Sequence, residues 1–179
     1  MGHGDSFKAY YLPKGKITKS AFNTHGFDVE MLQSKGAKEF TKGACEMLTN
    51  FLNREQDLPI VAHGVKYDRD AVLNPAFQRV WCSWLMPSDE RWVCTYELAR
   101  QRTDLVPRPT PKGLDSLLGH FGLEQRDPEA KHDAYIDCIK TAQLYMKLKA
   151  PTKAEISNDN GKNSSTGGKL SQSESNVPA

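Results

Sequence analysis

The sequence predicts an α/β domain over residues 1–150, followed by a disordered tail over residues 151–179. Short apolar runs typical of buried strands alternate along the first region with longer segments in which apolar residues recur at helical spacing. In the tail, Ile156, Leu170 and Val177 are the only large apolar side chains. A segment with so little apolar surface cannot offset the entropy lost on folding, which places the domain boundary near residue 150.

Composition restricts the possible functions only weakly. The formal net charge of +2 is too small to indicate nucleic-acid binding by charge alone, so such binding would need a local site. The sequence shows no CxxC pair, signal-peptide core or transmembrane stretch. We therefore expect an intracellular protein, cytoplasmic or nuclear, with buried free thiols at its four cysteines, Cys45, Cys82, Cys94 and Cys138.

The N-terminal elements follow from apolar spacing and capping residues. Residues 7–12 (FKAYYL) are predicted to form a short strand, and a loop then leads to His25 and Gly26. Asp28 is placed to cap a short helix (DVEMLQSK), and residues 38–53 have the apolar spacing of a longer helix.

Two further strands are predicted, each followed by a helix. Residues 59–63 (PIVAH) read as a buried strand, and residues 66–80 as a helix that Pro75 breaks or kinks. Residues 92–94 form the next predicted strand, after which Thr95 is expected to cap the helix YELARQR.

The C-terminal part of the domain is predicted to be helical. Prolines at 107, 109 and 111 form a stiff connector, after which LDSLLGHFG is expected to be a helix ended by Gly122. Residues 133–149 form the last helix, in which Asp137 lies beside the apolar stripe rather than opposite it.

Three polar residues at the start of the last helix have two alternative interpretations. In the structural one, Asp133 caps the helix, Asp137 is merely solvated and His132 is an ordinary loop residue. In the functional one, His132 turns from the loop toward Asp137, whose position beside the apolar stripe favours a cationic partner. Asp68 gives a second carboxylate at a helix start just after a buried strand, where α/β proteins build sites.

These residues lie in two segments that resemble the motifs of the DEDDh (DnaQ-like) 3′–5′ exonucleases. AHGVKYDRDAVL resembles the second motif, A-H-N-x-x-F-D-x-x-x-L, and KHDAYID matches the third, H-x-A-x-x-D. RWVCTYELARQ, KGLDSLLGHFGL and THGFDVEML resemble other parts of the family, so that the likeness runs in order from about Phe7 to Leu148.

The resemblance implies a fold, a reaction and roles for particular residues. The fold is a ribonuclease-H-like mixed sheet flanked by helices, and the reaction is two-metal phosphodiester hydrolysis with Mg²⁺ or Mn²⁺ at a single-stranded DNA or RNA 3′ end. Asp68 and Asp137 would be metal ligands, His132 the general base, and His63 and Gly64 substrate-binding residues. Gly64 stands where the family usually has asparagine. Partners would include a polymerase or another replication or repair protein, and no membrane is implied.

The family's first motif, D-x-E at the end of a hydrophobic strand, has no counterpart in this sequence. Asp28-Val29-Glu30 has the right letters, but no apolar strand precedes it, and we interpret Asp28 as a helix cap and Glu30 as a surface residue. We therefore expect an N-terminally incomplete domain with an incomplete metal site and impaired activity. The alternative is a catalytically inactive remnant that binds nucleic acid or protein.

Overall fold

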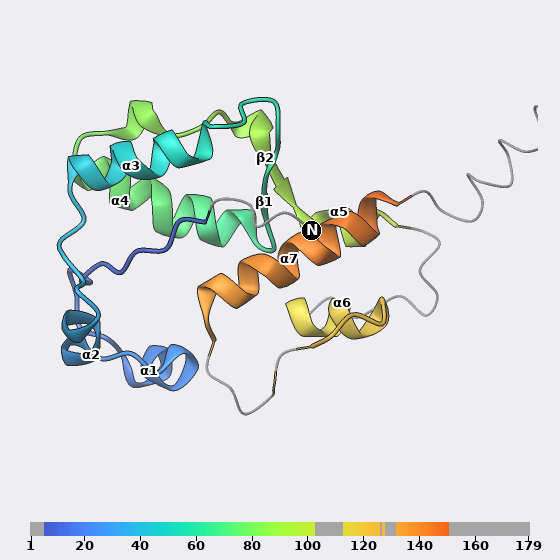
Figure 1. The fold of residues 1–179 in the computed structure, drawn as a ribbon, viewed down its shortest axis with the longest axis horizontal. Coiled ribbons are helices and arrows are strands. Elements are labelled where there is room, and N and C mark those ends of the chain that lie inside the picture. The colour runs from blue at the N-terminus through green and yellow to red at the C-terminus, as the bar shows by residue number, and fades with distance from the viewer. Residues whose placement is uncertain (1–5, 103–112, 126, 128–131, 151–179) are drawn as a thin grey trace, which may run out of the picture. The chain divides into compact units, whose positions relative to one another are not determined.

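The structure, a computed structural model, describes residues 6–102, 113–125, 127 and 132–150 (Figure 1). The proline-rich connector and the tail over 151–179 that the sequence predicts lie outside these residues. The chain divides into two compact units, Met1–Leu148 and Lys149–Ala179, and the features that follow belong to the first.

Three helices form the N-terminal part, α1 (Lys19–His25), α2 (Val29–Ser34) and α3 (Lys42–Leu52). Helix α1 replaces the predicted loop, because the Thr18 side chain caps its start and Gly26, at a φ of 76°, ends it. Asp28 caps α2 as predicted, with its carboxylate accepting a hydrogen bond of 2.7 Å from the Met31 N–H.

The predicted strand over residues 7–12 is wrong. The segment forms only an isolated parallel bridge between Tyr11 and Lys38, in which the Leu12 N–H donates to the Lys38 carbonyl over 2.9 Å. The same bridge holds the chain out of a helical conformation at residue 38. Helix α3 therefore begins later than predicted, at Lys42, with Thr41 as its cap.

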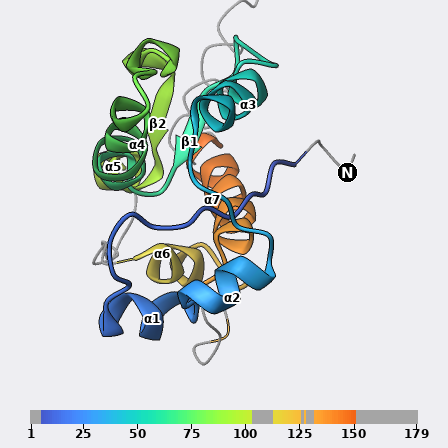
Figure 2. The same ribbon diagram turned by 90° about the vertical axis from the view of Figure 1, so that its left-hand side faces the viewer.

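Strands β1 (Ile60–Ala62) and β2 (Trp92–Cys94) confirm two predicted strands and pair in parallel, with Val61 opposite Val93. Figures 1 and 2 show them side by side. Both strands are half-buried rather than fully buried, because the described sheet contains just these two strands. Helices joined to a small parallel sheet give an α/β arrangement, which is the coarse class that the sequence predicts.

The segment after β1 is helical without a break at Pro75. It starts as a wide π-helix, η1 (Lys66–Leu73), and continues as α4 (Asn74–Arg79). The Asn74 N–H bonds to the Arg69 carbonyl, five residues back. The wider turn ahead of Pro75 avoids the clash that its ring would make with the preceding turn of a regular α-helix. Two short 3₁₀ turns follow, η2 (Ser83–Leu85) and η3 (Asp89–Arg91).

Three more helices follow β2, namely α5 (Thr95–Gln101), α6 (Leu114–His120) and α7 (Ala134–Lys149). Thr95 is the first residue of α5 rather than its cap, since its hydroxyl contacts His63 instead of the helix backbone. Gly122, at a φ of 64°, ends α6 as predicted.

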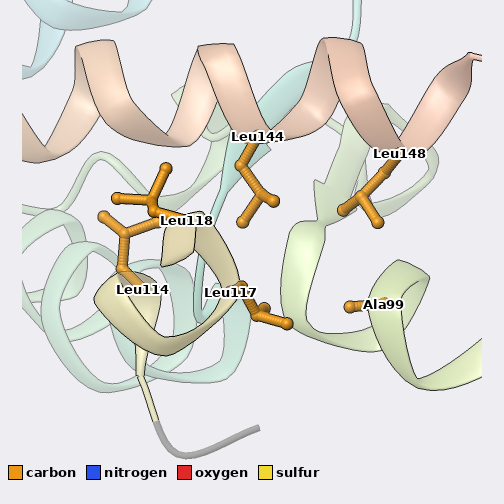
Figure 3. Close-up of a cluster of buried hydrophobic side chains, with 6 residues drawn as sticks. All are labelled: Ala99, Leu114, Leu117, Leu118, Leu144 and Leu148. Carbon is orange, nitrogen blue, oxygen red and sulfur yellow. The ribbon is translucent and has the colours of Figure 1, made fainter. Parts of the chain in front are cut away.

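The hydrophobic core has two clusters of buried side chains. One joins α5, α6 and α7, as Figure 3 shows, through Ala99, Leu114, Leu117, Leu118, Leu144 and Leu148. The other joins α3 to α4 and the turn after it through Cys45, Phe77 and Cys82.

The buried face of α7 differs in part from the predicted apolar stripe. Lys140, expected on the surface, is buried and its Nζ reaches Glu124 Oε2 at 2.8 Å. Ile136 and Ile139 are each 40% exposed instead.

Free thiols are found at all four cysteines, but only Cys45 and Cys82 are buried, so the prediction of four buried thiols is wrong for the half-buried Cys94 and the exposed Cys138. Among the helices described, none has the length and apolar character needed to span a membrane.

Candidate functional site

Asp68 lies in the first turn of η1, shortly after β1 ends. The Gly64 carbonyl accepts hydrogen bonds from the N–H groups of Tyr67 (2.8 Å) and Asp68 (3.0 Å), which fixes the start of this helix. Burial raises the pKa of the Asp68 carboxyl; a hydrogen bond with the Gly64 backbone lowers it, and the charge of Asp137 raises it again. Because the net shift is upward, an ionised Asp68 would be stabilised by a cation placed beside it.

Asp137 lies in the first turn of α7. Asp133 caps this helix, because its carboxylate accepts hydrogen bonds from the N–H groups of Tyr135 (2.7 Å) and Ile136 (3.4 Å). Asp137 closes the first turn through its own N–H, which donates to the Asp133 carbonyl over 2.9 Å. The charge of Asp137 is one of the causes of the raised pKa of Asp68, so the two helix starts, which are far apart in sequence, interact electrostatically.

His132 lies in the loop that enters α7, as the sequence analysis predicts. Its Nδ1 is 3.6 Å from Asp137 Oδ2, which is too long for a hydrogen bond but forms an ion pair when the imidazole is protonated. The His132 backbone is held from another segment, because its N–H donates to the Thr24 carbonyl at the end of α1 over 3.1 Å.

The pKa of the Cys138 thiol is raised from its ordinary value. Partial burial of the thiol raises the pKa of Cys138, and the charges of Asp68, Asp137 and Asp133 raise it further. Three carboxylates thus act on one side chain in the first turns of α7. Lys8 is paired with Asp133, so a cation bound here would act mainly on the charges of Asp68 and Asp137.

His63 and Gly64 connect the sheet to this site. His63 Nδ1 lies 2.9 Å from Thr95 Oγ1, and the His63 carbonyl accepts from the Cys94 thiol (3.3 Å) and the Tyr96 N–H (3.4 Å). These contacts tie the end of β1 to β2 and α5. A β-carbon added at Gly64 would meet Tyr67 Cβ at 4.0 Å, which is an ordinary van der Waals contact, so the backbone does not require glycine there.

Lys8 is a neighbour of the site that sequence reasoning missed. Its Nζ lies 3.2 Å from Asp133 Oδ2, and this hydrogen bond is the main cause that raises the pKa of Lys8. Burial by itself would raise the pKa of Asp133, but the hydrogen bonds from Lys8 and from the start of α7 outweigh it and lower that pKa. Lys8 and Asp133 are 125 positions apart, and no local pattern signals such a pair.

Asp28 and Glu30, which have the residue pattern of the D-x-E motif, have the structural roles predicted from the sequence. The Asp28 carboxylate is used as the cap of α2, and Glu30 is an exposed residue in the first turn of that helix.

The donor set fits one divalent cation better than two. Within the ranges that the structure describes, no group of three or more His, Cys, Asp or Glu side chains is arranged to hold a metal ion. Asp68 and Asp137 supply hard oxygen donors, and Mg²⁺ is commonly bound by one or two carboxylates together with waters and substrate phosphates. Their mutual repulsion would be relieved by such an ion.

Comparison with known proteins gives no family assignment, because no protein-family model and no curated protein matches this sequence. A function for this chain has to be argued from the motif residues and from the contacts around them.

Proposed function

We propose that this chain carries part of a DEDDh-type 3′–5′ exonuclease site, which hydrolyses phosphodiester bonds at a nucleic-acid 3′ end with the help of divalent cations. The observation that supports the proposal is the distance of 3.6 Å between His132 Nδ1 and Asp137 Oδ2 at the start of α7, together with the effect of the Asp137 charge on the pKa of Asp68 at the start of η1. A metal-binding carboxylate pair beside a histidine is suited to hydrolysis, while the resemblance of the two motifs supplies the substrate and the polarity.

Asp68 and Asp137 would hold Mg²⁺ or Mn²⁺ in this site. When bound, the cation compensates the charge of the scissile phosphate and makes a coordinated water easier to deprotonate. The two carboxylates would hold the cation from two helix starts, η1 and α7. The partial burial of Asp68 strengthens its attraction to a cation, because less water screens it.

His132 would act as the general base. Imidazole is the side chain whose ordinary titration lies nearest to neutral pH, which suits it to accept a proton from an attacking water. Since Nδ1 faces Asp137 Oδ2, we assign proton transfer to Nε2. The Asp137 carboxylate would then stabilise the imidazolium that forms, and the hydrogen bond from the His132 N–H to Thr24 limits the movement of the loop.

The expected turnover of this chain on its own is low. The family pattern uses four acids, and this sequence matches two of them, Asp68 and Asp137. Two carboxylates compensate two divalent ions poorly, so phosphate oxygens of the substrate would have to supply the remaining coordination. We therefore test metal binding and hydrolysis separately.

The first experiment measures Mn²⁺ binding by electron paramagnetic resonance, in the presence of a nucleoside 5′-monophosphate. Asp68→Asn and Asp137→Asn should each weaken binding by about tenfold or more, since each removes one of two charged ligands. Asp28→Asn and Glu30→Gln are matched controls, because they neutralise the other candidate acids while asparagine still caps α2. Unchanged binding in both site variants would contradict the proposal.

The second experiment follows a 5′-labelled single-stranded DNA or RNA under single-turnover conditions with Mn²⁺. We expect slow shortening from the 3′ end, and His132→Ala should reduce its rate by about 10²–10⁴ while oligonucleotide binding is retained. Oligonucleotide binding without Mn²⁺ binding or hydrolysis would instead favour the inactive remnant. Fast processive degradation that is lost in Asp28→Asn and Glu30→Gln would identify those acids as ligands and refute our interpretation of α2.

A further inference from the structure

A cavity of about 500 Å³ lies at the amino-terminal end of β1, and its volume is in the range typical of small-molecule sites. Its wall is formed by the end of α3, by the turn that follows, by the first residues of β1 and by Arg91. The candidate site begins at the other end of this strand, where Asp68 follows His63 and Gly64. The cavity is therefore separate from the residues assigned to hydrolysis.

Much of the cavity wall is apolar. Leu58, Pro59 and Ile60 follow one another along it, and Phe51 and Leu52 contribute from α3. Leu58 is 58% exposed and Pro59 is also exposed, so this surface is in contact with water. A ligand with an apolar body would remove that surface from water, which favours binding.

Arg91 places a positive charge in the same wall, because arginine stays protonated in proteins. Its Nη1 donates to Asn53 Oδ1, and its Nη2 donates to the carbonyls of Leu52 (2.8 Å), Glu55 (3.2 Å) and Leu58 (3.3 Å). All of these acceptors are neutral. Among the described residues, the charge of Arg91 is therefore balanced by dipoles and not by a carboxylate.

Arg91 also keeps donor capacity that these bonds do not use. The bonds run from Nη1 and Nη2, while Nε is buried without a hydrogen-bond partner in the part of the chain that the structure describes. A buried donor without an acceptor is unfavourable. The guanidinium of Arg54, which lies 5.4 Å from the centroid of the Phe51 ring, adds a second positive group to the wall.

We propose that this cavity binds a small organic carboxylate with an aliphatic body. The carboxylate would lie toward Arg91 and Arg54, because planar guanidinium groups match the geometry of a carboxylate. The aliphatic body would cover Leu58 and Ile60. This inference is independent of the proposed function, because it uses none of the residues assigned to metal binding or proton transfer.

A monocarboxylate fits this wall better than other small ligands. A neutral apolar molecule would leave the charge of Arg91 without an acidic partner, and a cation would be repelled by Arg91 and Arg54. Inorganic phosphate could use the guanidinium groups, but it has no apolar body and would leave Leu58 exposed to water.

Glu55 is an acid in the cavity wall and gives a test of the charge. Its carbonyl bonds to Arg91, whereas its exposed carboxylate would repel a bound carboxylate. Glu55→Gln keeps the carbonyl and removes this repulsion. Octanoate should therefore bind about threefold more tightly to this variant, as expected for one exposed charge pair.

The test titrates octanoate into the isotopically labelled chain and follows the Arg91 Nε–H signal by nuclear magnetic resonance. We expect a shift of this signal that saturates with octanoate, because the carboxylate would bind beside the guanidinium. Octanol has the same aliphatic body without the charge, and it should bind more weakly by about fivefold or more.

Leu58→Asp tests the apolar part of the wall, and Met47→Asp is its matched control. Leu58 is 58% exposed, and Met47, which lies on α3 outside the cavity wall, is 57% exposed. Leu58→Asp should weaken octanoate binding by about tenfold or more, because it removes an apolar contact and adds a like charge. Met47→Asp should leave the binding unchanged.

The proposal is overturned if octanol binds as tightly as octanoate, if inorganic phosphate displaces octanoate as well as hexanoate does, or if Leu58→Asp binds like Met47→Asp. The melting temperature of Leu58→Asp shows whether this variant is folded, and the octanol comparison and Glu55→Gln decide the question if it is not. Failure of this test leaves the Mn²⁺ experiment intact, because the two use opposite ends of β1.

Discussion

Trp81 occupies a backbone position that favours glycine, and its replacement by glycine should stabilise the protein. Its φ is 58°, in the left-handed region. The Trp81 N–H bonds to the Gln78 carbonyl (3.1 Å) and the Cys82 N–H to the Phe77 carbonyl (2.9 Å), which together form the Schellman motif at the end of α4. Phe77 and Cys82 also pack in the same buried cluster, so the motif is fixed by the core.

The expected gain follows from two opposing terms. The left-handed conformation destabilises a residue that has a β-carbon by about 1–2 kcal/mol, and Trp81→Gly removes this destabilisation. The greater conformational entropy of glycine in the unfolded chain lowers the free energy of unfolding by about 0.4–1 kcal/mol. The indole is 88% exposed, so little packing is lost with it. The free energy of unfolding should therefore rise by about 0.5–1 kcal/mol.

The assay is urea denaturation followed by circular dichroism, because the substitution removes a fluorophore. With an m-value of about 2 kcal/mol/M, the midpoint should rise by about 0.4 M at unchanged slope. Trp81→Ala is the control, since alanine keeps the β-carbon and should gain nothing. A lower midpoint for Trp81→Gly, or an equal rise for Trp81→Ala, would refute the strain argument.

Two further predictions concern the core and the cap of α7. Leu144→Ala should lower the free energy of unfolding by about 3–4 kcal/mol, because Leu144 of α7 is fully buried in the cluster that α7 shares with α5 and α6. Met146→Ala, at a residue that is 69% exposed, should change it by at most about 0.5 kcal/mol in the same urea titration. Because the pKa of Asp133 is lowered in the folded protein, its contribution to stability is present above the unfolded-state pKa and is lost as the pH falls through the folded-state pKa. Asp133→Asn, in which asparagine still caps the helix, should therefore make the free energy of unfolding less dependent on pH in the acid range. An unchanged dependence would contradict this prediction.

The parts of the fold that sequence predicted correctly are those specified by neighbours in the chain. Asp28 caps α2 and Gly122 ends α6 through bonds that span only a few residues. The strand predicted over residues 7–12 failed because a strand needs a partner, and Tyr11 finds only a single bridge at Lys38. Apolar spacing has the same limitation, since it cannot tell which apolar positions a neighbouring element will cover.

Helix α7 illustrates that limitation. Its spacing alone makes Ile136 and Ile139 equivalent to Leu144, but α5 and α6 cover only the Leu144 side. Lys140 lies on the covered side and is accommodated because its ammonium reaches Glu124. A long, flexible side chain can thus be buried along its stem and still place its charge at the surface, which a hydropathy pattern does not reveal.

The locations of the candidate site residues could be predicted from the sequence because these residues stand at the ends of predicted strands and helices. The positions of Asp68, Asp137 and His132 at element ends could be derived from strand and helix boundaries, and the structure has His132 Nδ1 3.6 Å from Asp137 Oδ2. The contacts that hold them could not be derived, because Lys8 and Thr24 reach residues 132–133 from the opposite end of the chain. Only the folded backbone brings such pairs together.

The start of α7 is consequently a point where separate parts of the molecule depend on one another. The N-terminal segment contributes Lys8, α1 contributes the Thr24 carbonyl and η1 contributes Asp68, and all three act on residues 132–137. A ligand that bridges η1 and α7 gains its full binding energy only when both helix starts are folded and close together. By linkage it must stabilise that arrangement by the same amount. A cation bound at Asp68 and Asp137 should therefore favour the conformation in which the starts of η1 and α7 are both folded.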